Sequence, residues 1–223
     1  MDYDAVVFDM DGVIVERSPS WVFTDAAERA LDEAGIEDPT GREFRTVRVL
    51  EAGIDWAADH FASTYEVAFG RLWRRRNELV AENQLTAIAD GDKGLYDDAE
   101  AILDVPAARG IVSNNQHTAV ETVLDQFDLR EHFDTWYGLA PGVDDIGAEK
   151  PATGYMERAL SDLATDDAVY VGDRASDVAA AHNVGIDAAF VRREFNAEDE
   201  PNPEPRFDVD SLHELRDTLA SGV

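Results

Sequence analysis

Two short motifs in the sequence combine carboxylates with glycine at the ends of apolar segments. The first, Asp9-Met10-Asp11-Gly12, directly follows the apolar run 5–8. The second, Gly172-Asp173 with Asp177 four residues on, directly follows the apolar run 168–171. In a chain with 29 Asp, chance predicts about four Asp-x-Asp pairs, and four occur, so the pair alone indicates nothing. Each longer motif is expected only about 0.25 times by chance, which singles out these two.

Carboxylates that gather in one place repel one another unless a cation lies between them. Strand ends of an open α/β sheet converge on one crevice, where we expect Asp9, Asp11, Ser113, Asp173 and Asp177 to meet. Oxygen ligands without cysteine or paired histidine favour Mg²⁺. A solvated acidic rim would explain the acidic composition, but it would not explain why these residues follow apolar runs.

Lysine is almost absent, which draws attention to the two that remain. The chain holds 17 Arg but only Lys93 and Lys150. Lys150 precedes Pro151, a residue that restricts the backbone before it to extended conformations. Chance retention is an alternative, but the position of Lys150 between the two carboxylate motifs favours a functional role.

The elements that must position these residues alternate along most of the chain. Short apolar runs typical of buried strands occur at 5–8, 110–112, 168–171 and 188–191. Helical patterns lie between or after them at about 97–104, 118–127, 153–163, 176–182 and 212–219. This alternation predicts an α/β core with right-handed crossovers.

Residues 16–90 break the alternation, because they contain helical patterns and no convincing strand. Start and stop signals predict one helix from Ser18-Pro19 to Gly35 and another from Asp38-Pro39 to about Gly53, and a long pattern then runs from 55 to 89. Within it, a stripe at helical spacing predicts the core of a bundle, through Phe61, Tyr65, Phe69, Leu72, Arg76 and Leu79. We therefore expect a helical insert after the first strand.

Composition restricts the possible partners and surroundings. The formal net charge is −29, with 48 acidic residues against 19 Lys and Arg, so nucleic acid and anionic membranes are poor partners. Acid enrichment with little lysine is typical of a halophilic protein, although an ordinary acidic protein is the alternative. The absence of cysteine excludes disulfides and thiolate sites, and no apolar run approaches the ~18 residues of a membrane span. We expect a cytoplasmic protein.

The motifs occur in the order of a known superfamily. Asp9-Met10-Asp11-Gly12-Val13, Val112-Ser113-Asn114, Lys150-Pro151 and Gly172-Asp173-Arg174-Ala175-Ser176-Asp177 together resemble the haloacid dehalogenase-like hydrolases. By position and helical content, the insert resembles the cap of the phosphoglycolate phosphatase-like subgroup. The resemblance implies an α/β fold with a three-layer Rossmann-like parallel sheet core, residues 1–15 and 91–223, and an inserted α-helical cap, residues 16–90.

The resemblance also implies a role for each residue. Asp9 would be the nucleophile that forms an aspartyl-phosphate, and Asp11 the acid and base, in a Mg²⁺-dependent phosphatase of a small phosphorylated metabolite. Ser113 and Lys150 would bind phosphoryl oxygens and complete the catalytic set, with Asn114 as a further substrate-binding residue. The metal would be held by Asp9, Asp173 and the backbone carbonyl of Asp11, with Asp177 as a ligand or directly behind the ligands.

Other functions and residues stay open as alternatives. A sugar-phosphate mutase of the same superfamily is disfavoured because 18–24 lacks the cap histidine expected there, and a dehalogenase because Asp11 is present. A non-catalytic binding protein on this fold would be expected to lack a motif. The substrate and the oligomeric state cannot be read from the sequence.

Arginines at 71, 74, 75 and 76 could attract an anion, but pairing with nearby acids is favoured. No pair of histidines has ligand spacing, and His117 is the one with some chance of facing the site.

Overall fold

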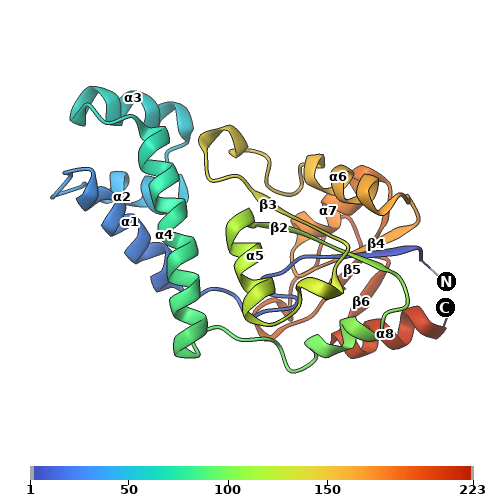
Figure 1. Cartoon of the computed structure of the whole chain (residues 1–223). Coiled ribbons are helices and arrows are strands. Elements are labelled where there is room, and N and C mark those ends of the chain that lie inside the picture. Colours follow the sequence, from blue (N-terminus) through green and yellow to red (C-terminus); the bar gives the residue numbers. More distant parts are fainter. Residues whose placement is uncertain (1–2, 222–223) are drawn as a thin grey trace. The chain divides into compact units, whose positions relative to one another are not determined.

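The computed structural model describes residues 3–221, which divide into two compact units (Figure 1). The first unit contains the residues up to Arg17, Gly94–Leu139 and the residues from Gly147 onward. The second contains Ser18–Lys93 together with the short segment Ala140–Ile146. The motif residues all belong to the first unit.

The first unit is built on one sheet whose six strands are all parallel and run in the order β3-β2-β1-β4-β5-β6. Their bounds are β1 (Ala5–Phe8), β2 (Ala108–Gln116), β3 (Thr135–Leu139), β4 (Ala168–Gly172), β5 (Asp187–Val191) and β6 (Phe207–Val209). The central strand β1 has both neighbours in register, since Phe8 pairs with Ile111 of β2 and with Val171 of β4. Asp9, which follows β1, therefore lies at the same level of the sheet as Val112 of β2 and Gly172 of β4.

Helices cover both faces of this sheet. The first unit contains α5 (His117–Gln126), α6 (Gly154–Leu163), α7 (Ala175–Val184) and α8 (Leu212–Ser221), with the 3₁₀ turns η1 (Ala99–Asp104), η2 (Arg130–His132) and η4 (Glu194–Asn196). Right-handed crossovers place α5, which leads outward from β2 to β3, on the face opposite to α6 and α7, which lead back across the sheet. Ala5 and Val7 pack with α6 and α7, whereas Phe8 packs edge-to-face on Phe133 with ring centroids 6.3 Å apart. The predicted α/β sheet with buried strands is confirmed.

Two local features of the first unit differ from the sequence expectation. Segment 97–104 forms the 3₁₀ turn η1 rather than an α-helix. Strand β3 was not expected, because Trp136 and Tyr137 at this sheet edge are only half-buried and the segment lacks a continuous apolar run. Edge position therefore explains why the sequence pattern is weak there.

The second unit is a helical bundle. It contains α1 (Ser20–Glu33), α2 (Gly41–Val49), α3 (Ile54–Tyr65), α4 (Phe69–Asp90) and the 3₁₀ turn η3 (Val143–Asp145). The expected stripe does form bundle core, because Phe61, Phe69, Leu72 and Leu79 are all buried. Among residues 3–221, no helix combines the length and apolar composition that crossing a membrane requires.

The long helical pattern at 55–89 is divided into two helices. Glu66 ends α3 in the left-handed conformation, with φ of 56°, and the backbone N–H of the next residue, Val67, donates to the carbonyl of Phe61 over 3.2 Å. Residues 63–69, on either side of Glu66, include neither glycine nor proline, so the usual signal of a helix end is missing. A single helix through this point was therefore the natural expectation, and it is wrong.

Helix α2 begins at a buried polar cluster. Thr40 and Glu43 form a capping box, in which the Thr40 backbone N–H donates to Glu43 Oε2 over 2.6 Å. Glu43 Oε1 accepts a hydrogen bond of 2.8 Å from the Tyr65 hydroxyl and lies 2.5 Å from His60 Nε2. Burial alone would raise the pKa of Glu43, but the hydrogen bonds from His60, Thr40 and Tyr65 outweigh it and lower the pKa to about 2. The carboxylate is thus held ionised inside the bundle.

Candidate active site

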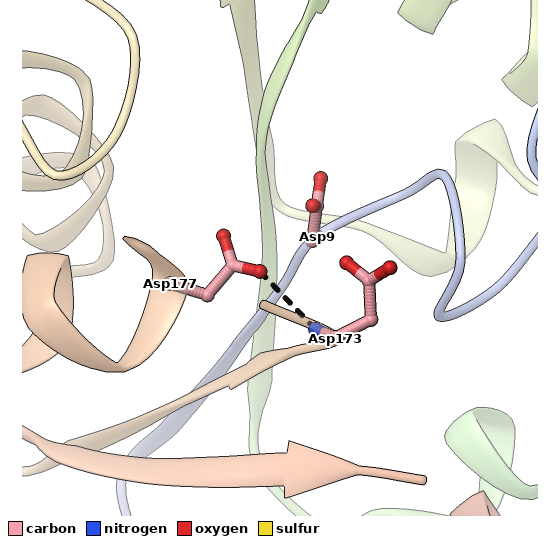
Figure 2. A group of neighbouring side chains, drawn as sticks. All are labelled: Asp9, Asp173 and Asp177. Atoms are coloured by element: carbon pink, nitrogen blue, oxygen red, sulfur yellow. Dashed lines mark hydrogen bonds between the residues drawn. The ribbon is translucent and has the colours of Figure 1, made fainter. Parts of the chain in front are cut away.

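Three carboxylates meet where β1 and β4 end. Asp9 follows β1, Asp173 follows β4, and Asp177 lies in the first turn of α7. Figure 2 shows their side chains gathered around one small space, and one oxygen from each lies within 4.8 Å of the others. All three are buried. The convergence expected from the two motifs is therefore present.

Lys150 completes this cluster with a positive charge. Its ammonium lies 2.9 Å from Oδ2 of Asp9 and 2.8 Å from Oδ1 of Asp177. Burial alone would lower the pKa of Lys150, but the Asp177 and Asp9 carboxylates outweigh it and raise the pKa above its ordinary value. These two contacts favour the charged form of Lys150, which lies between two acidic residues that are 168 positions apart in sequence.

For Asp9, the effect of burial on the pKa outweighs the effect of the neighbouring positive charge. Burial raises the pKa of the Asp9 carboxyl to about 6, and the adjacent Lys150 ammonium limits the rise. Oδ1 of Asp9 also accepts a hydrogen bond of 2.7 Å from the backbone N–H of Met10. These contacts orient the carboxylate and keep it available in its ionised form near neutral pH.

Asp173 is the group in this cluster that most requires a cation. Neither of its carboxylate oxygens has a hydrogen-bond partner among the residues described, although both are buried. The nearest guanidinium nitrogen, Nε of Arg174, is 4.0 Å away on an exposed side chain. Burial and the neighbouring Asp9 and Asp177 carboxylates raise the pKa of Asp173 to about 7. Orphaned, buried carboxylate oxygens beside a second carboxylate fit a hard divalent cation such as Mg²⁺.

Asp177 supports the cluster with both of its oxygens. Oδ2 accepts the backbone N–H groups of Asp173 and Arg174 over 3.1 and 2.9 Å, and Oδ1 pairs with Lys150. A Cβ placed on Gly172 would lie only 2.2 Å from Cβ of Asp177. Glycine at 172 therefore allows α7 to start directly against the end of β4.

Gly12 likewise allows a close approach, here between the loop after Asp9 and Asp173. Its φ is +91°, and a Cβ built on it would lie 2.3 Å from Oδ2 of Asp173. Any side chain at this position would be strained and would displace the carboxylate. The glycine of the first motif is thus explained by the closeness of the second motif.

The end of β2 carries Ser113 and Asn114 and contacts both Lys150 and Asp11. Ser113 is buried, and its hydroxyl accepts a hydrogen bond of 3.2 Å from the backbone N–H of Asn115. Asn114 is exposed, and its Oδ1 accepts the backbone N–H of Lys150 over 2.9 Å, so it holds the lysine segment beside β2. Oδ2 of Asp11 accepts a hydrogen bond of 2.7 Å from Nδ2 of Asn115.

Sequence reasoning missed two residues of this group. Asn115 contacts Asp11 directly, and its position straight after Ser113-Asn114 was the signal that could have identified it. Tyr170 is fully buried within β4; its hydroxyl accepts from Lys150 and donates to the carbonyl of Val112, both over 2.6 Å. The hydrophobic run around Tyr170 gave no sign of this polar contact.

The weaker polar candidates lie elsewhere. His117 accepts the backbone N–H of Gly138 at Nδ1 over 3.3 Å, and no contact with the carboxylates is found in the described part of the chain. Arg75 forms ion pairs with Glu33, Glu78 and Glu82, in agreement with the expectation that the arginines of this helix pair with nearby acids. A cavity of about 530 Å³ in the second unit is lined by mixed charges, including Arg71, Arg74, Glu33 and Glu66.

Comparison with known proteins gives one family. The family model described as haloacid dehalogenase-like hydrolase matches residues 6–191. A phosphoglycolate phosphatase from Photorhabdus laumondii is 26% identical over 190 residues, covering 81% of this chain and 76% of the relative. An (S)-2-haloacid dehalogenase from Pseudomonas putida is also 26% identical, over 57% of this chain and 56% of the relative.

Solved structures share the fold. CbbY from Rhodobacter sphaeroides, solved with phosphate, superposes with a TM-score of 0.68 at 18% identity, covering 96% of each chain. A HAD phosphatase from Thermococcus onnurineus gives a TM-score of 0.62 at 23% identity, covering 97% of each chain. Because both identities are below 25%, the similarity to these structures shows the fold alone.

Proposed function

The chain belongs to the haloacid dehalogenase-like hydrolases, and from this premise we propose that it is a phosphatase that hydrolyses small phosphorylated metabolites through an aspartyl-phosphate on Asp9. The observation that carries the proposal is the position of Lys150 between Asp9 and Asp177, with Asp11 two residues beyond Asp9. A fixed cation beside a carboxylate nucleophile suits a dianionic phosphoryl group, whose charge it offsets.

In the proposed first step, a carboxylate oxygen of Asp9 attacks phosphorus. The bond from phosphorus to the ester oxygen breaks, and Asp11 gives its proton to the departing alkoxide, which leaves as an alcohol. Ser113 and Lys150 bind phosphoryl oxygens, and Asn114 holds the lysine segment in place. Lys150 also keeps the Asp9 carboxylate from repelling the incoming phosphate.

In the proposed second step, Asp11 acts as a base. It takes a proton from a water molecule whose oxygen attacks phosphorus, so that the acyl-phosphate bond breaks, inorganic phosphate forms and the Asp9 carboxylate is restored. The hydrogen bond from Asn115 supports this role because it fixes the orientation of the Asp11 carboxyl group.

We propose that Mg²⁺ binds at Asp9 and Asp173, together with the backbone carbonyl of Asp11. When bound, it would supply positive charge beside the nucleophile and the phosphoryl group. The two orphaned oxygens of Asp173 support this assignment. Asp177 has both oxygens engaged by Lys150 and by backbone N–H groups, so its proposed role is to hold Lys150 and the Asp173 loop rather than to ligate directly.

Carbon–halogen hydrolysis is the alternative raised by the dehalogenase relative. Asp11 and its contact with Asn115 favour phosphate chemistry. A departing alkoxide needs an acid to protonate it, whereas a departing halide needs no proton. The sugar-phosphate mutase and non-catalytic alternatives lack a supporting observation. Halophilic character and cytoplasmic location stay predictions from the composition.

The test is a parallel measurement of phosphate and halide release. Purified protein with Mg²⁺ in concentrated KCl is assayed on a panel of phosphorylated metabolites that includes 2-phosphoglycolate, and on 2-haloacids. We expect inorganic phosphate release from at least one monoester and none in Asp9→Asn. Halide release without phosphate release, or isomerisation of a sugar phosphate without hydrolysis, would overturn the proposal.

A further inference from the structure

The segment after β5 binds the backbone of both loops that carry the metal-site carboxylates. Arg193 contacts the loop that follows Asp9, and Asn196 contacts the loop that follows β4. The two residues are also joined, because the backbone N–H of Arg193 donates to Oδ1 of Asn196 over 2.6 Å. Neither residue belongs to the motifs that the family resemblance identifies.

Arg193 holds the first loop by its carbonyl groups. Its guanidinium donates to the carbonyls of Gly12 and Val13 over 3.3 and 2.7 Å. Asp98 accepts two hydrogen bonds from the guanidinium, of 2.9 and 3.1 Å. The guanidinium carbon also lies 3.9 Å from the centroid of the Tyr96 ring. Both charged side chains are only 10% exposed. A planar guanidinium with bidentate support of this kind is a rigid contact.

Asn196 holds the second loop in a similar way. It is buried, and its Nδ2 donates to the backbone carbonyl of Asp173 over 2.8 Å and to that of Val191 over 3.1 Å. The carbonyl belongs to the same residue whose carboxylate oxygens are orphaned. Asn196 therefore ties Asp173 to the end of β5.

We propose that Arg193 and Asn196 form a clasp that fixes the Asp9–Val13 loop against Asp173 and so positions the two carboxylates for a divalent cation. Gly12 and Asp173 are packed so closely that a Cβ on Gly12 would lie 2.3 Å from Oδ2 of Asp173. A small movement of either loop would thus change the separation of the ligands. The inference rests on the proposed function, since it assigns positioning residues to that metal site.

The clasp is a different arrangement from ordinary stabilising arginine contacts in the same unit. Arg109 also donates to backbone carbonyls, those of His132, Ile102, Leu103 and Val105. It lies near the start of β2, where it pairs with Val6, and so at the other end of the strands from Asp9. Arg109→Met is therefore a matched control that loses stability without touching the loops of the site.

The experiment measures Mg²⁺ binding without substrate, from the rise in melting temperature as Mg²⁺ is added, and kcat and KM for an aryl phosphate. The variants are Arg193→Lys, Arg193→Met, Asn196→Ala and the control Arg109→Met. Residues that support metal ligands typically contribute ten- to hundredfold to metal affinity or activity. We expect the three clasp variants to need about tenfold or more Mg²⁺ for half-maximal stabilisation and to lose kcat more than KM.

The control separates positioning from general stability. Arg109→Met is expected to melt at a lower temperature but to keep the wild-type Mg²⁺ midpoint. If Arg193→Lys and Asn196→Ala fold and keep the wild-type Mg²⁺ midpoint and kcat, the clasp is wrong while the proposed function stands. If the wild-type protein shows neither Mg²⁺-dependent stabilisation nor phosphate release, the proposed function and the clasp are both overturned.

Discussion

Oδ2 of Asp11 accepts a hydrogen bond of 2.7 Å from Nδ2 of Asn115, a residue 104 positions further along the chain. The backbone of Asn115 is held in turn, because its N–H donates to the hydroxyl of Ser113. The contact couples the loop after β1 to the end of β2. It gives Asp11, the proposed acid and base, a fixed orientation at the end of β2.

Removing this contact should slow turnover without unfolding the protein. Asn115→Ala leaves Asp11 in place but removes the hydrogen bond that orients its carboxyl group, so we expect kcat to fall about tenfold or more, which is part of the 10²–10⁴ that acid–base catalysis contributes. KM should change less. Steady-state kinetics of wild type, Asn115→Ala and the exposed control Thr118→Ala check this, and an Asn115→Ala kcat within twofold of wild type would exclude the orienting role.

Lys150 should prove irreplaceable for both stability and activity. Lys150→Met leaves Asp9 and Asp177 buried without their cation, which in comparable buried pairs costs about 3–5 kcal/mol of the free energy of unfolding. We expect the phosphate release rate to fall by several orders of magnitude. Denaturant unfolding and kinetics measure the two effects.

Arginine should not rescue this site. Lys150 donates to Tyr170 and to the carbonyl of Val112 as a compact charge on a flexible stem, and a planar guanidinium is larger and has a fixed direction. We expect Lys150→Arg to remain poorly active. Full activity in Lys150→Arg would mean that the residue contributes only long-range charge.

The buried Glu43 predicts a specific acid sensitivity of the helical unit. Its pKa of about 2 in the folded protein lies below the ordinary value, so its contribution is complete above about pH 4.5 and is lost as the pH falls toward 2. A depression of this size corresponds to at most about 3 kcal/mol. Thr40, His60 and Tyr65 are the groups that contact the carboxylate.

The comparison of wild type with Glu43→Gln isolates this contribution from other acid effects. We expect the free energy of unfolding of the variant to be lower near pH 7 and the difference to shrink between about pH 4.5 and 2. A difference that stays constant over this range would show that Glu43 is not ionised in the folded protein. Denaturant titrations at each pH provide the measurement.

The sequence was sufficient to predict the strands that carry the site, because buried parallel strands are continuous apolar runs. Asp9, Asp173 and Lys150 could be singled out from spacing and rarity. The clasp could not be predicted, since Arg193 and Asn196 bind backbone carbonyls. No pattern of side chains in the sequence indicates which backbone carbonyl will lie next to a given side chain. The end of α3 at Glu66 was hidden for a related reason, because a left-handed residue other than glycine carries no compositional mark.

The charge of −29 predicts a strong dependence of stability on salt. At about 0.1 M salt the Debye length of ~10 Å leaves neighbouring surface carboxylates coupled, whereas at 1 M it falls to ~3 Å and their repulsion is screened. We expect the melting temperature to rise between 0.1 and about 2 M KCl, in the presence of a chelator that removes Mg²⁺. A flat or falling melting temperature would contradict the halophilic prediction and leave the phosphatase proposal unaffected.

The central claim is that the phosphoryl group passes through Asp9, and acid quenching during the first turnover tests it most directly. Wild type and Asp11→Asn are mixed with an aryl phosphate, whose phenolate leaving group departs without a proton from Asp11, then quenched at intervals and digested for peptide mass analysis. The account predicts one phosphoryl group on the peptide that contains Asp9, persisting longest in Asp11→Asn because the proposed base is missing, and none in Asp9→Asn. A phosphoryl group on another residue, or phosphate release at the wild-type rate by Asp9→Asn, would contradict it.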